Sequence, residues 1–228
     1  STTQIKDPEK GLSFNNKGKL NMKMGLNNLS ADDVINKLGP QELIDIFKIF
    51  GEENKSKIIV KKIISFRKNR NIQTEDLVKI INSSKKNKFS KVHNATKVFQ
   101  ALRIFVNNEI SELVYGLINS FNLLPIGGTL IVVTFHSIED KIVKFFFKNF
   151  SKNHSRTNKY LPENVNNLSL FDNYKNKIIK PTSKEININA RSRSAKLRYA
   201  IRSGEEFIDP KELRNKFKYL TDLEKRIA

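Results

Sequence analysis

Residues 129–147, TLIVVTFHSIEDKIVKFFF, decide the class of fold. The stretch opens with an unbroken apolar run at 130–133, which is typical of a strand that is buried on both faces. From residue 138 onward the apolar positions repeat with helical spacing. Because the strand follows a Gly127-Gly128 turn and runs directly into a helix, the stretch predicts an α/β protein with a parallel sheet.

The polar residues between this strand and helix are the first candidates for a functional site. Ligands of open α/β sheets bind at the carboxyl ends of strands, and Thr134, Phe135, His136 and Ser137 occupy such an end. His136 could bind a phosphate or a base edge, or transfer a proton, and it could equally be structural. Ser137 could instead be the N-cap of the helix, with Asp140 three residues later as in a capping box. Both readings stay open on these residues alone.

Four short helical patterns lie upstream and predict a small helical subdomain over residues 30–85. Ser30 is placed to cap the first helix, and Thr74 to cap the fourth. The four patterns cover residues 31–38, 43–50, 58–66 and 75–81.

A polar, basic linker at 82–95 leads to what reads as one long helix. Its apolar face runs from Val98 to Phe121, about seven turns at 3.6 residues per turn. Gln100, Arg103 and Asn107 lie on one line beside that face. They are either substrate-side residues or a hydrogen-bond network between helices, and spacing does not separate the two.

The last third of the chain does not complete a sheet. Residues 151–175 read as a long surface loop, residues 177–181 and 195–201 as a pair of strands, and residues 210–228 as an amphipathic helix. One buried strand and a late β pair cannot form a doubly wound sheet. We therefore expect further strands upstream of Ser1.

Composition excludes several classes of protein. The 228 residues include no Cys, which rules out a disulfide framework and a thiolate zinc site. His93, His136 and His154 have no metal-ligand spacing, so no metal site is predicted. No apolar run is long enough for a membrane span. The net charge of +19 favours a polyanionic partner, nucleic acid above all, although an AT-rich codon bias toward Lys and Asn would also raise it.

A cluster of cations precedes the last predicted strand. The segment 189–198, NARSRSAKLR, carries Arg191, Arg193, Lys196 and Arg198. Arginine presents a planar fork that suits phosphate oxygens and guanine edges. A solvated charged face is the plain alternative, but the cluster runs into a strand that would hold some of these side chains in place.

Six segments in order resemble the RsmH/MraW family of methyltransferases. They are GLSF at 11–14, NMKM at 21–24, FGEEN at 50–54, ATKVFQALRIFVNNEI at 95–110, GGTLIVVTFHSIEDKIVK at 127–144 and NARSRSAKLR at 189–198. The resemblance covers residues 1 to about 202. It implies S-adenosyl-L-methionine as cofactor and methyl transfer to the N4 amine of a cytidine in the decoding region. The implied partner is small-subunit ribosomal RNA or the small ribosomal subunit, with no membrane, in the cytoplasm.

The implied fold is the C-terminal portion of a class I, Rossmann-like methyltransferase with an inserted α-helical subdomain and with its N-terminal strands missing. The family carries its glycine-rich cofactor loop before the point where this chain begins, and its cofactor-contacting glutamine falls on Gln4. The expected regions are a loop at 1–29, the inserted subdomain at 30–93, the rest of the α/β domain at 94–202 and a helix at 203–228.

The resemblance also implies substrate-side roles, with departures. His136 and Ser137, together with Arg103, Asn107 and the four cations of the 189–198 segment, are the expected RNA-side residues. Lys23 and Lys97 stand where the family has Arg, which keeps the charge but loses bidentate geometry. No catalytic residue is assigned, because the (Asp/Asn)-Pro-Pro-(Tyr/Phe) motif of many amino-methyltransferases is absent. The alternatives are an inactive RNA-binding fragment and a helical interaction module.

Overall fold

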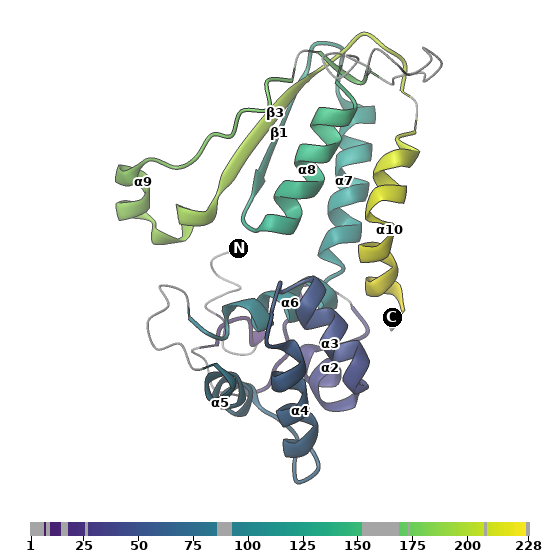
Figure 1. Ribbon diagram of the computed structural model, residues 1–228. Coiled ribbons are helices and arrows are strands. Elements are labelled where there is room, and N and C mark those ends of the chain that lie inside the picture. Colours follow the sequence, from purple (N-terminus) through teal and green to yellow (C-terminus); the bar gives the residue numbers. More distant parts are fainter. Residues whose placement is uncertain are drawn as a thin grey trace, which may run out of the picture. The chain divides into compact units, whose positions relative to one another are not determined.

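The computed structural model describes residues 7, 10–14, 18–25, 27–85, 93–151, 169–172, 174–207 and 209–226 (Figure 1). By its contacts the chain divides into two compact units. Unit 1 comprises Ser1–Ile110 and Leu220–Ala228, and unit 2 comprises Ser111–Tyr219. The region boundaries expected at 29, 93 and 202 mark an insertion in the family's fold. The division into two units by contacts does not test them, so they stay a prediction.

Unit 1 is helical. Its helices are α2 (Ala31–Lys37), α3 (Pro40–Ile49), α4 (Ser56–Phe66), α5 (Thr74–Ser84) and α6 (Thr96–Val106). The first four lie where their apolar stripes predicted them. Ser30 is the N-cap of α2, because its Oγ accepts a hydrogen bond from the Asp33 N–H at 3.1 Å. The cap predicted for α5 was wrong by one residue, because Gln73 is the N-cap and the Thr74 hydroxyl donates to the Gly18 carbonyl instead.

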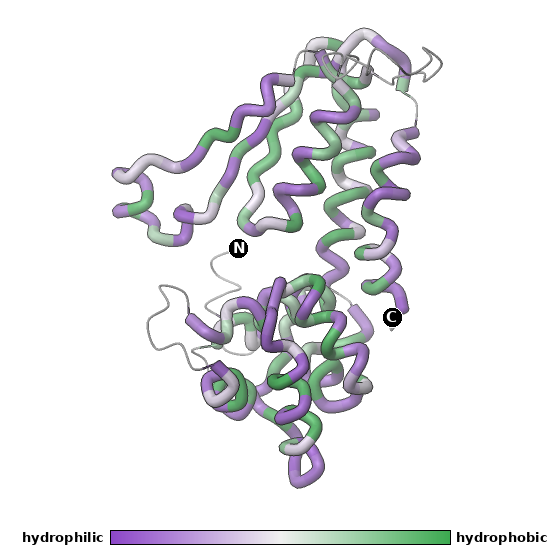
Figure 2. Tube along the Cα trace, in the orientation of Figure 1, coloured by the Kyte–Doolittle hydropathy of each residue, from purple (hydrophilic) through white to green (hydrophobic). Residues whose placement is uncertain are grey.

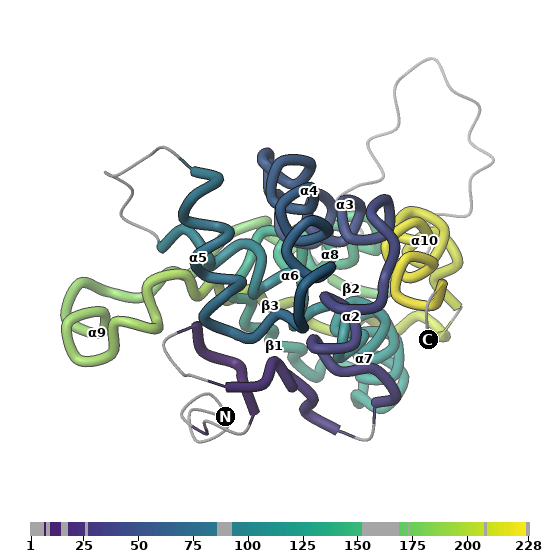
Figure 3. Tube along the Cα trace, turned by 90° about the horizontal axis from the view of Figure 1, so that it is seen from below, coloured from purple at the N-terminus to yellow at the C-terminus, as the bar shows by residue number. Residues whose placement is uncertain are grey.

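Backbone hydrogen bonds join residues 18–20, which precede α2 in the chain, to α2 and α5 (Figure 3). The Leu20 carbonyl accepts from the Asp32 N–H at 2.6 Å, and the Gly18 carbonyl accepts from the Thr74 N–H at 3.1 Å. Leu20 and Met22 are fully buried. The segment is therefore part of the unit 1 core.

The single long helix predicted over 98–121 is wrong, because α6 ends at Val106 and α7 (Glu109–Leu123) begins three residues later. Asn108 has a φ of 49°, in the left-handed region that Asn tolerates better than most residues. The apolar spacing continues across the break, so periodicity alone could not reveal it.

Unit 2 contains a three-stranded sheet in the order β1-β3-β2. Its strands are β1 (Thr129–Thr134), β2 (Phe171–Asp172) and β3 (Lys196–Arg202), with antiparallel pairing throughout. The α/β class is confirmed, but the parallel arrangement is not seen among the described strands. The pairing predicted between 177–181 and 195–201 is reduced to one bridge, Ile179 with Leu197. Of the predicted loop, residues 171–172 are β2, and 152–168 lie outside the described residues.

Helices complete unit 2. They are most of α7, α8 (Ser137–Asn149), α9 (Ser183–Ile188), the short 3₁₀ helix η3 (Ala190–Ser194) and most of α10 (Lys211–Lys225). Figure 1 shows α8 alongside β1 and β3. Nowhere in the described ranges is a helix both long and apolar enough to cross a membrane.

One face of the sheet is apolar and open. Ile131, Val133, Tyr199 and Ile201 share that face and are between 42% and 59% exposed. On the other face, Arg198 and Ala200 are buried. Figure 2 shows how hydrophobic β1 is along most of its length. Among the described strands β1 has a partner on one edge only.

Candidate functional site

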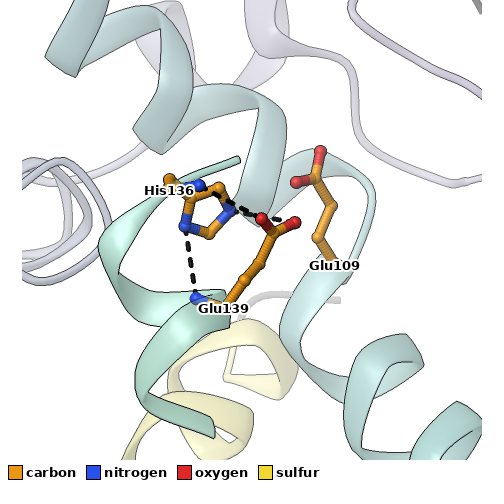
Figure 4. A group of neighbouring side chains, drawn as sticks. All are labelled: Glu109, His136 and Glu139. Carbon is orange, nitrogen blue, oxygen red and sulfur yellow. Dashed lines mark hydrogen bonds and ion pairs between the residues drawn. The ribbon is translucent and has the colours of Figure 1, made fainter. Parts of the chain in front are cut away.

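The predicted site at the end of β1 is built around a helix cap. The His136 Nδ1 accepts a hydrogen bond from the Glu139 N–H at 3.4 Å, and a Glu139 carboxylate oxygen accepts from the N–H groups of Phe135 at 2.8 Å and His136 at 3.2 Å (Figure 4). His136 is therefore the N-cap of α8. The cap predicted at Ser137, with Asp140 as its partner, was wrong by one residue, since Ser137 is the first residue of the helix.

Glu139 is held in its charged form. Burial alone would raise the pKa of its carboxyl, but the neighbouring His136 side chain and the two backbone N–H groups outweigh burial and leave that pKa below its usual range. His136 Nε2 lies 3.3 Å from a Glu139 oxygen. The carboxylate and the imidazole thus lie side by side at the start of α8.

Asp140 is instead the centre of a second cluster. Arg198 donates to both of its oxygens, at 2.8 and 3.3 Å, and Lys196 donates to one at 3.0 Å. Arg198 also donates to the Tyr174 hydroxyl at 2.8 Å. Burial alone would raise the pKa of the Asp140 carboxyl, but the two cations outweigh burial and lower it. This cluster ties α8 to β3 inside unit 2.

The four cations that were predicted to bind RNA therefore differ in exposure and in their partners. Arg198 is 1% exposed and its fork is taken by Asp140 and Tyr174, so it stabilises the fold rather than facing solvent. Lys196 is partly exposed. Arg191 and Arg193 are exposed on η3, whose first turn is closed by an Asn189 side chain that accepts from the Arg191 N–H at 3.2 Å.

Two further candidates lie in unit 1 and take part in a hydrogen-bond network. Arg103 forms a bidentate pair with Glu109 at 2.7 and 2.9 Å. Asn107 donates to the carbonyls of Met22 and Arg103 and accepts from the Met24 N–H and the Asn27 amide. The geometry thus supports the alternative of a structural hydrogen-bond network. A contact of Arg103 or Asn107 with substrate stays a prediction.

Gln4 lies outside the described residues. Sequence reasoning missed Glu139 and Tyr174 as members of these clusters. Glu139 could have been found from its position three residues after His136, as in a capping box. Tyr174 lies near the end of the loop predicted at 151–175 and carries no local signal.

Comparisons with known proteins give one consistent result. A family model described as the MraW methylase family matches residues 1–203, which ends before α10. A Rickettsia bellii protein is 41% identical over 203 residues, or 88% of this chain and 67% of the relative. Proteins of Parvibaculum lavamentivorans and Rickettsia africae are 39% identical over 89% and 88% of the chain. All three are named ribosomal RNA small subunit methyltransferase H. The chain spans between 60% and 67% of their length.

Proposed function

The chain belongs to the MraW methylase family, and from that membership we propose that it is the RNA-side part of an S-adenosylmethionine-dependent methyltransferase. The proposed substrate is the N4 amine of a cytidine in the decoding region of small-subunit ribosomal RNA. The match over residues 1–203 is the observation that carries the proposal. Exposed Arg191 and Arg193 support it, because arginine suits phosphate.

We propose that a preceding segment completes the sheet. A strand as apolar as β1 needs cover on its faces and neighbours on its edges, yet its outer face is open and one edge has no partner among the described strands. The relatives have about a third of their length outside the match. In this proposal that third supplies the missing strands, and residues 30–93 are the helical insertion.

The methyl-donor site is not assigned to this chain. The described residues contain no glycine-rich loop after a strand, and the one cofactor residue that the resemblance assigns is Gln4. We therefore propose that residues 1–228 alone transfer no methyl group. The chain's own part is to hold RNA and to present the target base.

Replacing Arg193 by Ala is expected to weaken RNA binding and to flatten its salt dependence. One phosphate contact on a single strand contributes a slope of about 0.7 in a plot of log affinity against log salt concentration. A titration of single-stranded ribosomal RNA fragments at several salt concentrations measures it. Arg193→Lys should retain the slope, because it retains the charge. An unchanged slope in Arg193→Ala counts against the assigned contact.

The unassigned donor site also favours a second candidate, an RNA-binding fragment that takes no part in methyl transfer. The same titration separates this candidate from a helical interaction module. Both RNA-binding proposals require affinity that falls steeply with salt, whereas an interaction module whose charge reflects codon bias requires no RNA affinity.

A further inference from the structure

Unit 1 carries a row of aromatic rings that leads from its core to its surface. The rings of Phe14 and His93 are stacked, with centroids 4.3 Å apart and planes 5° apart. The Phe14 ring in turn meets the edge of the Phe99 ring, with centroids 5.8 Å apart. Phe99 is buried in α6, whereas His93 is exposed. The row therefore ends in an exposed imidazole.

The imidazole is held in a fixed orientation. Its Nδ1 accepts a hydrogen bond from the Ala95 N–H at 3.2 Å, just before α6. In the neutral ring the proton is then on Nε2, which can donate. Phe14 stacks on one face of the ring, and the His93 residue as a whole is exposed.

A flat aromatic face next to an N–H donor suits an unpaired nucleobase. Bases of single-stranded RNA stack on Phe, Tyr, Trp and His side chains, largely without regard to sequence. Lys97, the second residue of α6, is exposed and offers a cation for a neighbouring phosphate, although its Nζ also donates to the Glu52 carbonyl at 2.8 Å.

We propose that His93, backed by Phe14, is a stacking platform for an unpaired base of the substrate RNA. This inference rests on the proposed function, since it names a binding residue for the same RNA. It adds an uncharged contact with a base to the phosphate contacts proposed for Arg191 and Arg193.

The test replaces His93 by Asn in the full chain. Asn Oδ1 can take the place of Nδ1 as acceptor for the Ala95 N–H, so the variant removes the ring and keeps the local hydrogen bond. The probe is a single-stranded RNA octamer that contains one 2-aminopurine, whose fluorescence is quenched by stacking. We expect about tenfold weaker binding and loss of quenching, with the salt slope unchanged, because no charge is removed.

Two variants serve as controls. His93→Tyr should restore both affinity and quenching, since tyrosine also offers a flat ring. Tyr219→Ala removes another exposed aromatic side chain, on α10, and should change neither.

The outcomes separate the two proposals. If the wild-type chain binds the octamer with the expected salt dependence and His93→Asn binds equally well with equal quenching, the stacking platform is wrong and the proposed function stands. If the wild-type chain does not bind the octamer at all, both are wrong. Loss of affinity in His93→Asn that His93→Tyr does not restore also contradicts a stacking role.

Discussion

Replacing Arg198 by Ala is expected to lower the free energy of unfolding by about 3–5 kcal/mol, the usual result of removing one partner from a buried ion pair. Arg198 is 1% exposed and holds Asp140 through two hydrogen bonds. Without it, the Asp140 carboxylate keeps only Lys196, and the Tyr174 hydroxyl loses its donor. Urea unfolding followed by circular dichroism measures the change.

Arg193→Ala is the matched control for this prediction. It removes another arginine side chain, five residues earlier, which is exposed. Surface substitutions of this kind usually change stability by less than about 0.5 kcal/mol. The double variant Asp140→Ala with Arg198→Ala should be less destabilised than the sum of the two single variants, because the residues are in contact. Equal stability losses for Arg193→Ala and Arg198→Ala would contradict the buried network.

The effect of Arg198→Ala should depend on pH. The pKa of Asp140 is lowered in the folded protein. The ionised carboxylate therefore contributes stability that is fully present above about pH 4, the pKa of an aspartate in the unfolded chain. That contribution is lost as pH falls through the folded pKa. The difference in stability between the wild-type chain and Arg198→Ala should therefore narrow below about pH 4. A difference that stays constant from pH 7 to pH 3 would exclude the carboxylate as the main partner.

Replacing Gly51 by Ala should destabilise unit 1 by about 1–3 kcal/mol or more, as overpacking does. A Cβ at this position would lie 2.6 Å from the Lys97 carbonyl oxygen and 2.7 Å from the Phe47 carbonyl oxygen. Both are backbone atoms, of α6 and α3, so neither can move without shifting a helix. Thermal unfolding of the variant measures the loss.

Gly116→Ala is the control for the glycine prediction. Gly116 lies in α7, and a Cβ there meets nothing within 4 Å. Ala is favoured over Gly inside a helix by roughly 0.5–1 kcal/mol, so this variant should be as stable as the wild-type chain or more stable. A Gly51→Ala variant that unfolds at the same temperature as the wild-type chain would show that α3 and α6 do not approach each other closely.

The local structure was largely predictable, because its signals are local. Ser30 and Asp33 form a cap within four residues, and the apolar stripes placed α2 to α5. The break between α6 and α7 was not predictable, because the apolar spacing runs through it. Only the conformation of Asn108 and the contacts of Asn107 with Met22, Met24 and Asn27 reveal it.

It was not predictable either which cations of the 189–198 segment are exposed. Arg191 and Arg198 look alike in the sequence, yet one is exposed and the other is buried. What decides between them is that Arg198 lies on the buried face of β3 and has two partners, Asp140 and Tyr174, that lie 58 and 24 residues away from it. Contacts over such separations leave no periodic signal, so a charged segment shows that cations are present and not which of them reach solvent.

The most direct test of the central claim is transfer of a labelled methyl group from S-adenosyl-L-methionine to small ribosomal subunits that lack the modification. Residues 1–228 would be assayed alone and fused to the third of the Rickettsia bellii relative that lies outside the match, a relative that is 41% identical over the shared part. We predict that the fusion labels a cytidine of the small-subunit RNA and that the chain alone binds the RNA without labelling it. Labelling by the chain alone at the rate of the fusion would contradict the claim that a preceding segment supplies the methyl-donor site.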